Sequence, residues 1–212
     1  MAQPKRVYKF LSLKYGIEAL DQNHLKVSEL GGLNDPFDVL PFDLSKTATR
    51  RMMQNVREHF GETTGMISFS KHWHSPLLWA HYADIHKGFA LGFDITSDRG
   101  WGEVIYVNKP MPVKNVMTAS EAEDIVNTKY SGWSYEEEVR MWIYLVKRSA
   151  NGLHFFDFNK QLVLKEVVVG HANRISQKAI SEALKGHPGV RLMKARPAHK
   201  EFMMVKDLKG LS

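Results

Sequence analysis

Alternation of apolar and polar residues along the chain predicts more strands than helices. Apolar residues at every second position, or in short continuous runs, are typical of strands. Such segments are residues 6–12, 24–29, 65–71, 87–95, 102–108, 133–146, 155–158 and 161–169, followed by the short segments 190–195 and 201–205. The strands and helices do not alternate regularly, which disfavours a doubly wound parallel sheet.

Apolar residues at helical spacing predict the helices that surround this sheet. They are residues 14–21, 46–60, 76–83, 120–129 and 175–185. The second of these carries its apolar face on Met52, Met53, Val56 and Phe60. Ser75 followed by Pro76 is typical of an N-cap and first helical position, and Asn173 is expected to cap the last helix. The fold predicted is α+β, with a mixed or antiparallel β-sheet core and surrounding helices.

Chain length and charge predict a single domain with a basic end. The chain has 212 residues, of which 43% are hydrophobic, enough for one core. Residues 171–212 hold nine Lys or Arg against three acids, so this segment carries all of the net charge of +6. Residues 6–170 form the predicted body. A solvated basic surface is the more common explanation of such a segment, and RNA or DNA is the expected partner otherwise, because clustered Lys and Arg attract phosphates.

The composition excludes several classes of protein. Without cysteine there is no disulfide framework, thiolate nucleophile or cysteine zinc site. No apolar run approaches the roughly 18 residues of a membrane span, and no secretory signal follows the first methionine, so a cytoplasmic location is expected. His72 and His74 lack zinc-ligand spacing to Asp84 or His86, and no metal is expected. Phosphate-binding, dinucleotide-binding and serine-hydrolase glycine motifs are also missing.

The candidate chemistry is sharpest at Glu136 and Glu138, an E-x-E pair inside a predicted strand. In a strand these side chains project about 7 Å apart on one face, with Arg140 next to them. Two close carboxylates suit acid/base catalysis or the stabilisation of a cation. The alternative is a solvated edge-strand face on which Arg140 neutralises Glu138.

Three further patterns are weaker candidates. Ser68 and Ser70 share one face of a predicted strand, as in many half-buried sheets. Leu78, Trp79 and Tyr82 form an apolar stripe that is either core or a surface for a ligand ring, with His81 as a possible proton donor. The residues 34–38, Asn-Asp-Pro-Phe-Asp, predict an ordered turn.

Several of these segments together resemble a known but uncharacterised family of bacteria and phages. The segments YKF, LNDPFD, SFS, LLWAHYADIHKGFALGFD and WSYEEEVR occur in the order typical of Domain of Unknown Function 2971. This resemblance covers residues 8–140, with a weaker extension to 170. It implies no particular reaction.

A more distant resemblance links the chain to ADP-ribosyltransferases of the Arg-Ser-Glu type. That type has an aromatic and a basic residue on its first strand, then a Ser-x-Ser strand, then a late E-x-E, and this order is similar here. Lysine at position 9 replaces the arginine of the type. The resemblance implies an ADP-ribosyltransferase-like fold, with NAD as substrate and no metal.

The same resemblance implies a role for each matching residue. Glu138 would stabilise the ribosyl cation that forms when the nicotinamide bond breaks, and Glu136 would orient or deprotonate the acceptor. The residues expected to bind NAD are Tyr8, Lys9, Ser68, Ser70, Trp79 and Tyr82. Arg140, Asn34 and Asp35 are expected to contact the substrate or its phosphates.

Three hypotheses for function follow. The first is an NAD-dependent ADP-ribosyltransferase-like enzyme, a toxin or phage-conflict effector that modifies nucleic acid or protein. The second is a non-catalytic nucleotide- or nucleic-acid-binding module that uses the basic segment. The third is a metal-dependent nuclease built on the carboxylates Asp35, Asp38, Glu136 and Glu138. A cleft lined by Lys9, Ser68 and Glu138 would favour the first.

Overall fold

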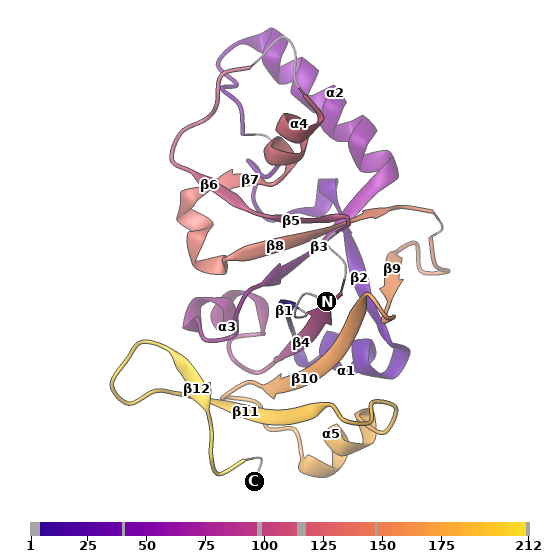
Figure 1. Cartoon of the computed structure of the whole chain (residues 1–212), viewed down its shortest axis with the longest axis vertical. Coiled ribbons are helices and arrows are strands. Elements are labelled where there is room, and N and C mark those ends of the chain that lie inside the picture. The colour runs from indigo at the N-terminus through magenta and orange to yellow at the C-terminus, as the bar shows by residue number, and fades with distance from the viewer. Residues whose placement is uncertain (1–4, 40, 97–98, 114–117, 147, 211–212) are drawn as a thin grey trace. The chain divides into compact units, whose positions relative to one another are not determined.

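The chain folds into two compact units (Figure 1). The computed structural model describes residues 5–39, 41–96, 99–113, 118–146 and 148–210. Unit 1 comprises Met1–Leu25, Phe69–Asp98 and Phe156–Ser212, and unit 2 comprises Lys26–Ser68 and Arg99–Phe155. The chain passes from one unit to the other within β2 (His24–Glu29), β3 (Thr64–Ser70) and β9 (His154–Asp157).

Unit 1 is built on a mixed sheet. Its main strands are β1 (Lys5–Leu11), β4 (Phe89–Ile95), β10 (Leu162–Val169), β11 (Arg191–Pro197) and β12 (Met204–Lys206). β4 lies between β1 and β10 and is antiparallel to both, β10 is parallel to β11, and β11 is antiparallel to β12. Because β4 is covered on both faces, all but one of its residues are buried, which explains its continuous apolar run.

Helices α1 (Leu13–Gln22), α3 (Pro76–Tyr82) and α5 (Gln177–Ala183) complete unit 1. The Ser12 hydroxyl caps α1 by accepting from the Tyr15 amide. Trp79 of α3 is fully buried and packs edge-on against Phe10, with 5.2 Å between ring centroids. Asn173 does not cap α5, contrary to the sequence prediction: Ser176 does, and the Asn173 amide donates to the Lys87 carbonyl instead.

Polar side chains on the sheet of unit 1 pair across strands. Arg6 lies opposite Asp94, with 2.5 Å between Nε and Oδ1, and also contacts Glu166 at 2.6 Å. The Tyr8 hydroxyl donates to Glu166 Oε2 at 2.8 Å. The Tyr8 ring lies over Gly92, where an added Cβ would come within 2.9 Å of Cε1. A side chain at position 92 would therefore displace this tyrosine.

Unit 2 holds the other elements of the chain. Its helices are α2 (Thr47–Thr63), α4 (Ala119–Val126) and the 3₁₀ turns η1 (Leu30–Gly32) and η2 (Ser131–Glu136), and its strands are β5 (Trp101–Glu103), β6 (Ile105–Val107), β7 (Thr128–Tyr130) and β8 (Glu138–Tyr144). β8 pairs with β3 and β5, and β6 runs parallel to β7. Thr118 and Glu121 form a capping box that starts α4.

Three expectations about unit 2 are wrong in detail. Residues 133–146 are not one strand, because η2 occupies its first part and β8 begins only at Glu138. The segment 102–108 divides into β5 and β6. On α2 only Met53 is buried, so the predicted apolar face is partly exposed at Met52 and Val56.

The fold is α+β with a mixed sheet, as the order of elements predicted. Within the described ranges, no helix has the length and apolar character needed to span a bilayer.

Candidate functional site

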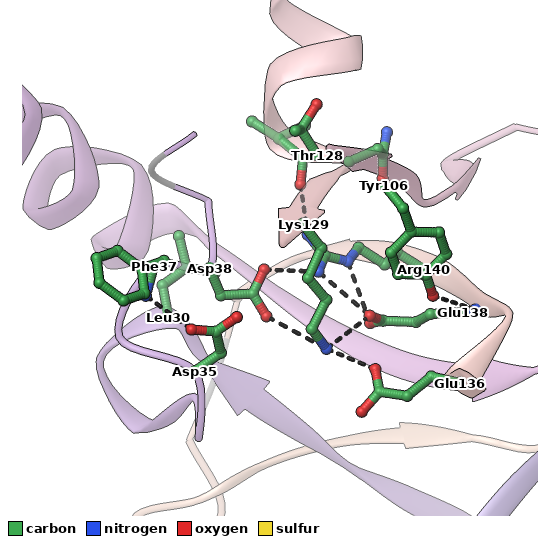
Figure 2. A network of polar contacts seen from close by, with 12 residues as sticks. Leu30, Asp35, Phe37, Asp38, Tyr106, Thr128, Lys129, Glu136, Glu138 and Arg140 are labelled. Atoms are coloured by element: carbon green, nitrogen blue, oxygen red, sulfur yellow. Dashed lines mark hydrogen bonds and ion pairs between the residues drawn. The ribbon is translucent and has the colours of Figure 1, made fainter. Parts of the chain in front are cut away.

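Five charged side chains meet in the interior of unit 2 (Figure 2). They are Asp38, Lys129, Glu136, Glu138 and Arg140, and each is at most 5% exposed. We call this set the buried ion-pair network. Charged groups are rarely buried unless they are paired, so their contacts with one another are what permit this burial.

Lys129 lies at the centre of the three carboxylates. Its Nζ is 2.6 Å from Glu136 Oε2, 3.0 Å from Glu138 Oε2 and 3.8 Å from Asp38 Oδ2. The same ammonium lies 5.1 Å from the centroid of the Trp133 ring. The ammonium of Lys129 is therefore surrounded by the two kinds of group that bind it favourably, carboxylate oxygens and an aromatic face.

Arg140 links Glu138 to Asp38, which is 102 positions away in the sequence. Its Nη2 is 2.6 Å from Asp38 Oδ1, its Nε is 3.1 Å from Glu138 Oε1, and its Nη1 donates to the Val126 carbonyl at 2.6 Å. The guanidinium is fully buried. Its planar set of donors is satisfied from three directions, which a lysine could not reproduce.

Backbone conformation explains why Glu136 and Glu138 converge. Glu136 ends η2, Glu137 adopts a left-handed conformation with φ 42° and ψ 52°, and Glu138 starts β8. The prediction that both carboxylates project from one strand is therefore wrong. Glu136 reaches Lys129 from a 3₁₀ turn, and Glu138 reaches it from a strand. The alternative of a solvated strand face is wrong about solvation, because both side chains are buried, but Arg140 does pair with Glu138 as that alternative expected. Glu138 and Arg140 do share a face of β8, as predicted.

Electrostatics keep Glu138 ionised. Burial by itself would raise the pKa of Glu138, but Arg140 and Lys129 outweigh burial and lower the pKa to about 2, with a further contribution from a hydrogen bond to Ser68. Burial raises the pKa of Asp38, and Arg140 and Lys129 only partly offset it. The pKa of Lys129 is raised despite its burial, because three carboxylates surround it. Glu138 is therefore the firmly charged acid of the network.

Asp35 lies beside the network in the turn that the sequence predicted. Its Oδ1 accepts from the Phe37 amide at 2.9 Å, and the Asp38 amide donates to its carbonyl at 3.1 Å, which confirms the turn. Its Oδ2 is buried without a hydrogen-bond partner among the described residues, and Figure 2 shows the carboxylate turned toward Asp38.

A hollow of about 320 Å³ opens next to the network in unit 2. Lys129 belongs to its wall as well as to the network, and the rest of the wall is mostly apolar. Phe37 and Tyr130 at its wall are 63% and 54% exposed, so both aromatic side chains are accessible to a ligand in the hollow. The hollow also has a polar part, formed by Asn108 and Lys109.

The residues predicted for the site fall in both units. Unit 2 brings Ser68, Glu136, Glu138, Arg140 and Asp35 into or beside the network, whereas Asn34 is exposed. The other predicted residues, Tyr8, Lys9, Ser70, Trp79 and Tyr82, belong to unit 1. There the Tyr8 hydroxyl is bound to Glu166, Ser70 is buried, and Trp79 and Leu78 belong to the core, so the Trp79 ring has no free face for a ligand.

Lys129 is the member of the network that the sequence interpretation missed. It was expected at the end of a helix, but it lies on β7 and points inward. The sequence does contain a local indication of this strand. Thr128 and Tyr130 are strand-forming residues on either side of Lys129, and the preceding Asn127 is a poor helix former.

Comparison of the chain with protein-family models, curated proteins and solved structures finds no match. Both family resemblances therefore stay predictions. In the described part of the chain, no three histidine or acidic side chains are placed to hold one metal ion. That includes the four carboxylates of the nuclease hypothesis.

Proposed function

We propose that the protein binds a nucleotide, with the base held in the hollow of unit 2. The observation that carries the proposal is an apolar hollow with two exposed aromatic rings at its wall. Nucleobases stack on aromatic side chains, and apolar clefts with a few polar groups are typical of small-molecule sites. Phe37 and Tyr130 supply the rings in this proposal.

The polar groups at the hollow suit the remainder of a nucleotide. Lys109 is exposed and forms no ion pair with another described residue, so its ammonium is available to a phosphate. Asn108 accepts from the Ser131 hydroxyl through Oδ1, which leaves its amide donors for the edge of a base. The buried network stabilises the wall behind them, because Lys129 belongs to both.

Isothermal titration of the purified protein with NAD, AMP and ribose 5-phosphate tests this proposal. We expect NAD and AMP to bind, and ribose 5-phosphate, which has no base, to bind at least tenfold more weakly. Phe37→Ala should weaken AMP binding roughly tenfold or more, because stacking on an aromatic ring contributes about 1–3 kcal/mol per base.

Tyr15→Ala is the matched control, since Tyr15 of unit 1 is 57% exposed, close to the 63% of Phe37, and does not line the hollow. It should leave AMP binding unchanged. Equal affinity for AMP and ribose 5-phosphate, or no binding of either nucleotide, would contradict the proposal.

A second candidate function is the breakdown of NAD with transfer of ADP-ribose. It is favoured by the contact between Ser68 and an ionised Glu138, the serine and the acid that the ADP-ribosyltransferase resemblance names. A carboxylate near the ribose stabilises positive charge as the nicotinamide bond breaks. It comes second because Glu138 is only 3% exposed and its oxygens are already bonded to Arg140 and Lys129.

Nicotinamide release from NAD, measured in a chelator with and without RNA or cell lysate, tests this candidate. Glu138→Gln keeps the shape of the side chain but removes its charge, so we expect release to fall roughly a hundredfold or more. Glu137→Gln is the control, because that neighbouring side chain is exposed. Release that is unaffected by Glu138→Gln, or absent in the unmodified protein, would reject the candidate.

A further inference from the structure

The C-terminal part of unit 1 forms a hairpin with an excess of positive charge. We call residues 191–209 the cationic hairpin: β11, the loop 198–203, β12 and the three residues after it. This segment has six Lys or Arg (191, 194, 196, 200, 206 and 209) and two acids (201 and 207), a balance of +4. It is the part of the basic segment that a strand pair holds in a defined place.

Five of these six cations have no acidic partner among the described residues. Arg191 pairs with Glu166 of β10. Within the described chain, no ion pair reaches the other five, which are Lys194, Arg196, Lys200, Lys206 and Lys209. Unpaired cations repel one another when they are gathered on one hairpin, and an anionic partner would relieve that repulsion.

The loop of the hairpin carries a fully exposed aromatic ring. Phe202 lies in the loop between β11 and β12, which projects beyond the two strands in Figure 1. Single exposed apolar side chains are common on protein surfaces, so this ring indicates a ligand only in combination with the cations around it. An aromatic ring among unpaired cations is the combination by which proteins hold single-stranded nucleic acid, since the ring stacks on a base and the cations bind phosphates.

A recess beside this ring is large enough for a base. It has a volume of about 380 Å³ and is formed by residues 197–204 together with Pro76 and His86. Phe202 and Lys200 both belong to its wall. An acidic membrane surface would also attract cations and an exposed phenylalanine, but binding to a membrane surface does not require such a recess, whereas a base can occupy it.

We infer that the cationic hairpin is a binding surface for single-stranded nucleic acid. Phosphates lie along its five unpaired cations, and a base stacks on Phe202. This inference is independent of the nucleotide proposed for the hollow of unit 2, because it rests on different residues in the other unit.

Fluorescence anisotropy of labelled 12-residue oligo(U) and oligo(dT) with the full-length protein tests the inference. With five phosphates neutralised, affinity should fall about 130-fold between 50 and 200 mM KCl, since each contact on a single strand contributes about −0.7 to the slope of log affinity against log salt. Phe202→Ala should weaken binding about tenfold without changing that slope.

Two double variants with equal loss of charge locate the surface. Lys200→Gln with Lys206→Gln should reduce the salt slope by about 1.4. The control is Lys178→Gln in α5 together with Lys185→Gln just after this helix. Both lysines are also exposed, and this double variant should leave the slope unchanged. All four positions are on the surface, so the variants should fold.

Several results would overturn the inference. They are no binding at 50 mM KCl, the same loss of slope in both double variants, no effect of Phe202→Ala, and tighter binding to phosphatidylserine vesicles than to either oligonucleotide. The two proposals have separate ligands and separate variants, AMP with Phe37→Ala and the oligonucleotides with Phe202→Ala, so failure of the hollow and failure of the hairpin are measured separately.

Discussion

Arg140→Met is expected to lower the free energy of unfolding by about 3–5 kcal/mol. Methionine fills much of the space of the arginine, but it leaves Asp38 and part of Glu138 buried without the donors that now lie 2.6 and 3.1 Å away. Removing one partner from a buried set of charges costs far more than the pair contributes, because the remaining charge stays desolvated. Urea unfolding followed by far-ultraviolet circular dichroism measures the loss.

Arg148→Met is the matched control for this prediction. Arg148 also pairs with a carboxylate, Glu29, at 3.2 Å in the same unit, but its side chain is 59% exposed. Water screens such a pair, so its removal should cost less than about 1 kcal/mol. A similar loss in the two variants would show that the buried network contributes no more than a surface ion pair.

Gly88→Ala is expected to destabilise unit 1 by about 3 kcal/mol or more. A Cβ at Gly88 would lie 2.0 Å from the Leu11 carbonyl oxygen and 3.0 Å from backbone atoms of Ala83. Backbone cannot rotate away as a flexible side chain can, so the strand ends of β1 and β4 must separate. The preceding residues Asp84, Ile85 and His86 all have positive φ, and this unusual turn has little freedom to adjust.

The same denaturation measurement with Gly186→Ala provides the comparison. No atom lies within 4 Å of a Cβ built at Gly186, and its φ is not in the left-handed range. Alanine there should be neutral or slightly stabilising, because it restricts the unfolded chain. The steric explanation fails if the two alanine variants unfold at the same urea concentration.

The carboxylates of the buried ion-pair network are already paired with cations. Two cations hold three carboxylates within hydrogen-bond or ion-pair distance, so the E-x-E pair already has partners in the absence of any ligand. Because their oxygens are already bonded to Lys129 and Arg140, these carboxylates are better placed to hold those two cations in position than to contact a substrate. For this reason the exposed rings at the hollow, and not the two glutamates, carry the proposed function.

Local pattern was sufficient for much of the secondary structure. The apolar run of β4, the alternation in β1 and β10, and the turn formers at residues 34–38 each reflect forces between residues that are close in the sequence. The same period-two rule correctly placed Glu138 and Arg140 on one face of a strand. The charge imbalance of the C-terminal segment is likewise a property of composition alone.

Only the tertiary structure decided which of these side chains contact one another. Asp38 meets Arg140 across 102 positions, and Lys129 meets Glu138 because β7 and β8 place both side chains in the interior. The left-handed backbone at Glu137, which turns Glu136 toward Lys129, leaves no periodic trace in the sequence. Ion pairs of this kind depend on strand pairing and desolvation, which are set by the whole unit, so local patterns could name the charged residues but not their partners.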